Sequence, residues 1–360
     1  MSHDTCKLGG KTLGLDLGDR SSRFCVLDSH GKVIDEGRVS TARKAMRRRF
    51  AANEPMRVVI ETGTHSPWVA ELFGALGHEV VVADARRLQL ISRSRRKSDR
   101  RDADLLARLG RVDTKLLHPI RPRSAKVRQD LTLLRSRAAL VESRTKLVNH
   151  VRGTAKSLGH RLRRCSARSL HRQVEGQLPA SVWALLAPVL ETVEVLTEKI
   201  RALDQRIEEL CRTSYRDTAK VRQVQGVGPL TALCFVLTLE QASRFERRRQ
   251  VGAYLGLVPR RDQSGASDPE LHITKTGDRM LRTLLIQCAH YVMGPFAQDS
   301  DLRRFGLRLA SRGGKNARKR AIVAVARKLS VLLHSLWSTG EVYEPLRNGG
   351  APATTLQASA

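Results

Sequence analysis

The first third of the chain alternates short apolar runs with longer amphipathic stretches. Runs rich in Val, Ile and Leu predict five β-strands, at residues 11–17, 23–28, 32–39, 57–61 and 79–83. Apolar positions at helical spacing predict three helices, at residues 41–53, 66–76 and 98–110. The links between the first three strands are too short for helical crossovers, so we expect these strands to pair as an antiparallel meander.

Three hairpin-linked strands followed by helix-separated strands is the order of a ribonuclease-H-like α/β domain. An all-parallel, doubly wound sheet fits this order less well, because each of its connections needs a crossover of about a dozen residues or more. We place the α/β domain at residues 1–115.

Residues 116–215 are predicted to be helical, with two apolar stripes. The first stripe comprises Leu131, Leu134, Ala138, Val141 and Val148. The second has the alternating spacing of a coiled-coil seam and comprises Val182, Leu186, Val189, Val193, Leu196, Ile200, Leu203, Ile207 and Leu210. Either the two helices form a hairpin within one chain, or the seam joins copies of the chain as a dimer or tetramer. The basic stretch 159–173 connects the helices, and Pro188 is expected to break or kink the second one.

Residues 216–345 are predicted to form a third, mainly helical domain, so the fold class is α/β plus all-α. Gly226 to Pro229 predict a tight turn between two helical patterns, and a loop runs from Pro259 to Thr276. Further helices are expected at 277–293 and 316–337. The small and polar residues of 346–360 are typical of a disordered tail.

Charge narrows the class of partner. Lys and Arg number 65 against 35 Asp and Glu, a formal net charge of +30, which favours a polyanion such as nucleic acid. The chain has neither a run of 18 apolar residues nor a signal-peptide core, so we expect a cytoplasmic protein without a membrane partner. Its six cysteines are scattered without a Cys-x-x-Cys pair, as in reduced proteins. Aromatic residues make up 4%, so base stacking is not expected to dominate binding.

Two carboxylates end predicted strands in this basic chain. Asp16 closes the run Leu13–Leu15 and Glu61 closes the run Val58–Ile60. Neighbouring strand ends bring such residues close together. Alone, Asp16 is equally compatible with a metal ligand, a phosphate loop of an actin-like sugar kinase or a turn, and Glu61 with a surface residue.

A second pair lies in the arginine-rich stretch KSDRRDADLLARL. Asp99 and Asp102 are three apart and share one helix face, whereas Asp104 points to nearly the opposite face. Residues 86–128 hold 15 basic and 4 acidic residues, so the alternative is a solvated helix with Asp–Arg pairs. Clustered carboxylates suit Mg²⁺, which binds oxygen ligands and phosphates.

Two further features concern nucleic acid. The turn at Gly226 and Gly228 resembles a helix-hairpin-helix element, whose backbone N–H groups bind phosphate, although such turns also merely connect helices. Candidate backbone contacts, or alternatively solvated surface residues, are Arg222, Arg279 and Arg282.

Ser264 lies in the loop Asp262–Gly265, where a serine is ordinarily a turn residue. The sequence shows no neighbouring histidine base, so a hydrolase triad is not supported. A metal-activated serine would require the carboxylates to reach it.

Taken together, these stretches resemble the DEDD-type transposases of bacterial insertion sequences, family one hundred and ten. The resemblance covers about residues 11–335. Its motifs are Asp16, the Glu61–Thr62–Gly63 strand end, KSDRRDADLLARL, GVGPLTALCFVLTLEQASRFERRRQVGAYLGLVPRRDQSG, HITKTGDRMLRTLLIQCA and GGKNARKRAIVAVARKL.

The resemblance implies a RuvC-like N-terminal domain, a coiled-coil middle and a C-terminal transposase domain. It implies that Asp16, Glu61, Asp99 and Asp102 are a tetrad holding Mg²⁺ or Mn²⁺, and that Ser264 is the nucleophile. The family often has two serines before the glycine; Gln263 stands here instead, and Ser267 is an outside candidate.

The implied activity is DNA strand cleavage and exchange through a phosphoserine, with donor and target DNA paired to a structured guide RNA from the element. The site's two halves are expected to come from different subunits. The alternatives are a RuvC-like nuclease that uses water, and a non-catalytic nucleic-acid-binding relative.

Overall fold

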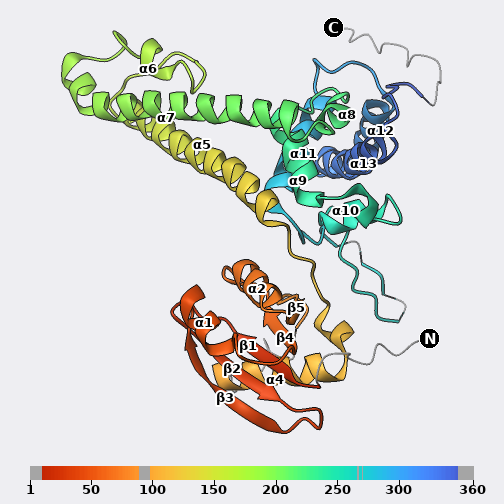
Figure 1. Cartoon of the computed structure of the whole chain (residues 1–360). Helices are drawn as coiled ribbons and strands as arrows, with labels where there is room; N and C mark the ends of the chain where they lie inside the picture. Colours follow the sequence, from red (N-terminus) through yellow and green to blue (C-terminus); the bar gives the residue numbers. More distant parts are fainter. Residues whose placement is uncertain (1–9, 89–97, 266, 270, 348–360) are drawn as a thin grey trace. The chain divides into compact units, whose positions relative to one another are not determined.

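The protein divides into two compact units, residues 1–124 and 125–360. The structure is a computed structural model that describes residues 10–88, 98–265, 267–269 and 271–347 (Figure 1). Most of the predicted tail, from residue 348 on, therefore lies outside the described residues. Each unit is described by itself.

The first unit is built on a mixed five-stranded sheet of order β3-β2-β1-β4-β5. The meander β1–β2–β3 is antiparallel, as predicted, and β4 and β5 continue the sheet parallel to β1. The strands are β1 (Thr12–Asp16), β2 (Ser21–Leu27), β3 (Val33–Ser40), β4 (Arg57–Glu61) and β5 (Glu79–Ala83).

Helices cover both faces of this sheet because the buried strand residues alternate between them. One face, with Leu13 and Leu15, packs on α1 (Arg43–Phe50) and α2 (Ser66–Ala75). The other face carries Val59 and Val81, which pack around Leu106. That leucine belongs to α4 (Asp99–Val112), which the short helix η1 (Thr114–Leu117) follows.

The helix α4 lies unusually close to β1. A Cβ atom built on Gly14 would lie 2.1 Å from the carbonyl oxygen of Ala103 and 2.5 Å from the nitrogen of Ala107. One turn further on, a Cβ on Gly110 would lie 2.2 Å from a methyl group of Val59. Small residues on both elements therefore let the helix backbone rest on the strand.

Replacing Gly14 by Ala is expected to destabilise the first unit by about 1–3 kcal/mol, because the added methyl group forces α4 off the sheet. Gly74→Ala is the matched control: Gly74 lies in α2 of the same unit, and nothing lies within 4 Å of the place that its new methyl group would take. That change is expected to be neutral or mildly stabilising. Urea unfolding measures both, and equal stabilities for the two variants would contradict the close packing.

The second unit begins with two long helices, α5 (Ala125–Ser157) and α7 (Ala180–Thr213), that lie side by side (Figure 1). Arg137 Nε donates to Asp204 Oδ1 over 2.6 Å, and Arg144 Nη1 donates to Thr197 Oγ1 over 3.2 Å. These pairs run in opposite directions along the two helices, so the helices are antiparallel. The connecting segment contains α6 (Leu170–Gln173).

This arrangement is the intramolecular hairpin, one of the two alternatives for the seam. Four seam residues spaced seven apart are buried in the hairpin: Leu186, Val193, Ile200 and Ile207. The intervening seam residues are only half-buried: Val182, Val189, Leu196, Leu203 and Leu210. Joining of copies through this second set stays a prediction.

Pro188 does not break α7, so that part of the expectation was wrong, and the expected kink stays a prediction. The helix runs through Pro188 without interruption from Ala180 to Thr213. Proline removes only the hydrogen bond to the carbonyl of Ala184, and both residues are exposed, so water can satisfy that carbonyl.

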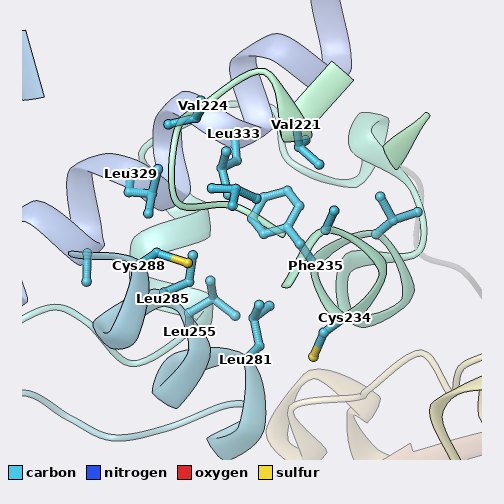
Figure 2. Packing of buried hydrophobic residues seen from close by; sticks show 14 of the residues in the cluster. Val221, Val224, Cys234, Phe235, Leu255, Leu281, Leu285, Cys288, Leu329 and Leu333 are labelled. Atoms are coloured by element: carbon cyan, nitrogen blue, oxygen red, sulfur yellow. The ribbon is translucent and has the colours of Figure 1, made fainter. Parts of the chain in front are cut away.

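The rest of the second unit is a helical core. Figure 2 shows Phe235 among residues from several segments, including Val221, Leu285 and Leu333. The predicted turn between α8 and α9 and the predicted helices α11 and α13 are confirmed, whereas α12 was not predicted. The elements are α8 (Thr218–Arg222), α9 (Pro229–Leu239), η2 (Ala242–Arg244), α10 (Gln250–Tyr254), α11 (Arg279–Val292), α12 (Asp301–Ala310) and α13 (Ala317–Thr339).

Two described helices, α7 and α13, are long and apolar enough to cross a membrane by length and composition. In the structure α13 lies in the helical core and α7 packs on α5. Helices in the core of a protein commonly have this length and composition, so these two helices are only weak evidence for a membrane span.

Candidate active site

The two strand-end carboxylates lie next to each other in the sheet. The parallel strands β1 and β4 are in register as far as Leu15 opposite Ile60, and Asp16 and Glu61 are the next residues of each strand. Both carboxylates are half-buried.

Alternation along the strands places both on one face. Gly14 of β1 and Val59 of β4 face α4, and Asp16 and Glu61 lie two residues further along the same strands. The two carboxylates therefore project on the α4 side of the sheet, at its carboxyl-terminal edge.

The direction of α4 brings the other pair to the same edge. Ala103 and Ala107 lie over Gly14, whereas Gly110 lies over Thr12, so α4 runs antiparallel to β1. The first turn of α4 therefore points toward the end of β1 that carries Asp16. This turn holds Asp99, which is exposed, and Asp102, which is only 8% exposed.

The sequence also explains where α4 begins. Ser98 is its N-cap, and the serine Oγ accepts a hydrogen bond from the Arg101 backbone N–H over 3.4 Å. The carboxylates of Asp99 and Asp102, in the first turn, interact favourably with the positive end of the helix dipole. They consequently stabilise the helix in addition to any part in the site.

Asp104 does not belong to this group, as predicted from its position on the helix. It accepts a hydrogen bond from Arg108 Nε over 2.9 Å and lies 3.8 Å from the Cys25 sulfur on β2. Burial, with the nearby Asp104 carboxylate, raises the pKa of the Cys25 thiol to about 11. The thiol is thus neutral and acts as a packing residue.

Loop contacts that sequence reasoning missed hold the strand ends. His65 Nδ1, after β4, accepts a hydrogen bond from Trp68 Nε1 over 3.1 Å, and His65 Nε2 lies 3.6 Å from an Asp19 oxygen in the loop after β1. Thr62, next to Glu61, accepts the backbone N–H of Ala85 on its hydroxyl over 3.1 Å. The sequence signal that could have pointed to these contacts is that His65, Thr62 and Asp19 lie just after the ends of β4 and β1.

The donor set suits a hard divalent cation. All four candidate side chains are carboxylates, the ligands that Mg²⁺ and Mn²⁺ prefer. The two strand ends and the first turn of α4 that carry them lie toward one edge of the sheet. Among the described residues, however, no three Asp, Glu, His or Cys side chains are gathered closely enough to hold a metal ion. The type of ligand and the placement of its elements fit a divalent cation.

Ser264 lies in the second unit, at the tip of a hairpin-like loop. Pro259 pairs with Ile273 at the base of the loop, and the backbones of Ser264 and Ser267 exchange two hydrogen bonds, of 3.1 and 3.0 Å, at the tip. Ser264 is exposed, and its hydroxyl has no hydrogen-bond partner among the described residues. The hydroxyl is accessible, and nothing described in the structure activates it.

The glycine turn is also present. Gly226 adopts φ +90°, and a Cβ there would lie 2.7 Å from the Tyr291 ring, so this position requires glycine. Around Gly228, the residue before α9, the space is open. An approaching phosphate could reach the backbone at this point.

The three candidate arginines differ in their surroundings. Arg222 forms an ion pair with Glu208 over 2.8 Å. Arg282 donates to the carbonyl oxygens of Leu255 and Thr276 over 3.2 and 2.8 Å, which fixes the adjoining loop. Arg279 is exposed at the start of α11.

Comparison with known proteins connects both units to one family. A family model described as a transposase, of the DEDD type of IS110 elements, matches residues 13–159. A second, described as transposase of the IS116/IS110/IS902 family, matches residues 218–306.

Relatives match over most of the chain. A probable family 20 transposase of Pseudomonas aeruginosa is 30% identical over 344 residues, 92% of this chain and 98% of the relative. The transposase for insertion sequence element IS1111A of Coxiella burnetii is 29% identical over 92% of this chain and 91% of the relative. A pilin gene-inverting protein of Moraxella lacunata is 26% identical over 39% of this chain and 44% of the relative. The chain belongs to the IS110 family of insertion-sequence transposases.

Proposed function

We propose that this transposase cleaves and exchanges DNA strands through Ser264, with a divalent cation held by Asp16, Glu61, Asp99 and Asp102. The observation that carries the proposal is the delivery of these four carboxylates, from two strands and one helix, to a single edge of the sheet. The inverting activity named for the Moraxella relative is also a rearrangement of DNA and agrees with strand exchange.

In the proposed reaction the Ser264 oxygen attacks a phosphodiester phosphorus. The bond from phosphorus to one deoxyribose oxygen breaks, that oxygen takes up a proton and leaves as a hydroxyl, and the serine proton passes to solvent or a base. The product is a phosphoserine ester. A hydroxyl of the partner strand then attacks this ester, releasing the serine and joining the strands, so that phosphodiester bonds are conserved.

The cation, the carboxylates and Ser264 have different roles in the proposed reaction. A divalent cation, when bound, lowers the cost of charge on the phosphoryl oxygens. Asp102 is held against the sheet by burial and fixes one side of the site, whereas exposed Asp99 can adjust to a ligand. The loop tip leaves Ser264 open to a phosphodiester as bulky as a DNA strand.

The proposed partners are donor and target DNA and a structured RNA encoded by the element, which would specify sequence through base pairing. A dimer or tetramer, joined through the half-buried seam residues of α7, would allow the carboxylates and Ser264 of one site to come from different copies of the chain.

Ser264→Ala is expected to abolish both strand cleavage and the covalent protein–DNA adduct, a loss of at least about a thousandfold, because the nucleophile is gone. A plasmid carrying the element's own ends, incubated with the protein and Mg²⁺, provides the assay, and denaturing gels detect the adduct. Ser267→Ala, at the same loop tip, is the matched control and should keep both. Cleavage that persists in Ser264→Ala would instead support a nuclease that uses water.

Asp102→Asn is expected to reduce metal-dependent cleavage at least about a hundredfold, because a neutral amide is a poor ligand for a hard cation. Asp104→Asn, on the same helix but directed toward β2, should retain most activity. Thermal unfolding verifies that both variants fold. Full cleavage by Asp102→Asn would contradict the metal site and favour a non-catalytic role for the carboxylates.

A further inference from the structure

After Asp301, the first residue of α12, the chain carries only positive charges to the end of α13. Between Leu302 and Gly340 the chain carries ten Lys and Arg residues and no Asp or Glu. In the whole chain basic residues outnumber acidic ones by less than two to one, 65 against 35. The excess of basic over acidic residues is therefore greater in this segment than in the chain as a whole.

Two of these cations stabilise the fold. Arg303 donates to the carbonyl oxygens of Val292 and Gly294 at the end of α11. Arg304 forms an ion pair with Asp299 over 2.7 Å. Both lie near the start of α12.

Five other cations surround the turn between α12 and α13, and we call them the basic turn cluster. All are exposed, and with the described residues none of their side chains forms an ion pair or hydrogen bond. The cluster comprises Arg308, Arg312, Lys315, Arg318 and Lys319. These cations have no evident part in holding the fold together.

The turn itself is open. Gly313 and Gly314 have φ +77° and +91°, and among the described residues no atom lies within 4 Å of a Cβ built on either. The described residues therefore leave free space beside both glycines.

Helix electrostatics makes the cluster unfavourable for the isolated chain. Arg318 and Lys319 are the second and third residues of α13, at the positive end of its dipole, and its first turn contains no acidic residue. Cations concentrated where a helix favours an anion indicate that an anion is supplied from outside.

We propose that the basic turn cluster binds the phosphate backbone of duplex DNA, independently of sequence. Duplex DNA is favoured because the chain is a transposase and because the cations are clustered on a turn without exposed aromatic residues of its own. The turn lies beyond the residues that the two family models match. The inference rests on the proposed action on DNA but not on the nucleophile.

The test measures binding of the full chain to an uncut DNA duplex of mixed sequence. Fluorescence anisotropy gives the binding constant at several salt concentrations. The variant is Arg318→Gln with Lys319→Gln, which removes both positive charges and keeps polar side chains of similar helix propensity. Each lost phosphate contact should reduce the slope of log K against log salt by about 0.9, so two give about 1.8. Affinity at 0.1 M salt should fall at least about tenfold.

The matched control is Arg201→Gln with Arg206→Gln, which removes two exposed cations from α7. The control should keep the wild-type slope. An equal loss in the control, an unchanged slope in the first variant, or a loss confined to a structured RNA would overturn the proposal.

Thermal unfolding separates binding from a structural role. Without DNA, the Arg318/Lys319 variant should gain about 2 °C in Tm, because repulsion at the helix N-terminus is relieved. A lower Tm would mean that the cations support the fold and would contradict the proposal. Because uncut DNA is used, failure of the serine chemistry would leave these results unaffected, and failure here would leave the Ser264 test intact.

Discussion

The candidate site depends on direct packing of the α4 backbone against β1. At Gly14 there is no side chain, and Ala103, Ala107 and Gly110 on the helix are small, so the two backbones approach without a side-chain layer between them. Arg57 fixes the position along the strand by donating to the Gly110 carbonyl over 3.0 Å and pairing with Glu79. A helix one side-chain layer further away would hold Asp102 further from Asp16 and Glu61.

The same packing explains how a basic chain can concentrate negative charge. Around residues 86–128 the acidic side chains are few, yet two of them occupy the first turn of α4, where the helix dipole favours carboxylates. The second unit shows the opposite arrangement, with cations at the first turn of α13. In the proposals above, the carboxylates of α4 bind a cation and the cations at the start of α13 bind a phosphate.

Sequence patterns predicted the first unit well, because most strands there are short and apolar and are bounded by turns. The antiparallel meander of the first three strands followed from connection lengths, and the separation of Asp104 from Asp102 followed from helix geometry. Helix α12 was not predicted, although Leu302, Phe305 and Leu309 have helical spacing and pack on the core. The helix that packs against the α7 seam could be identified only from the structure, because an a/d pattern does not specify which helix packs against it. The loop contacts of His65 depend on tertiary proximity, which local patterns do not contain.

In the proposed site Asp16, Glu61, Asp99 and Asp102 share one divalent cation at the edge of the sheet. Anomalous diffraction from crystals grown with Mn²⁺ tests this most directly. We predict a manganese peak bounded by the ends of β1 and β4 and the first turn of α4, and loss of that peak in Asp102→Asn. A fully occupied manganese site elsewhere, with no density at this edge, would contradict it.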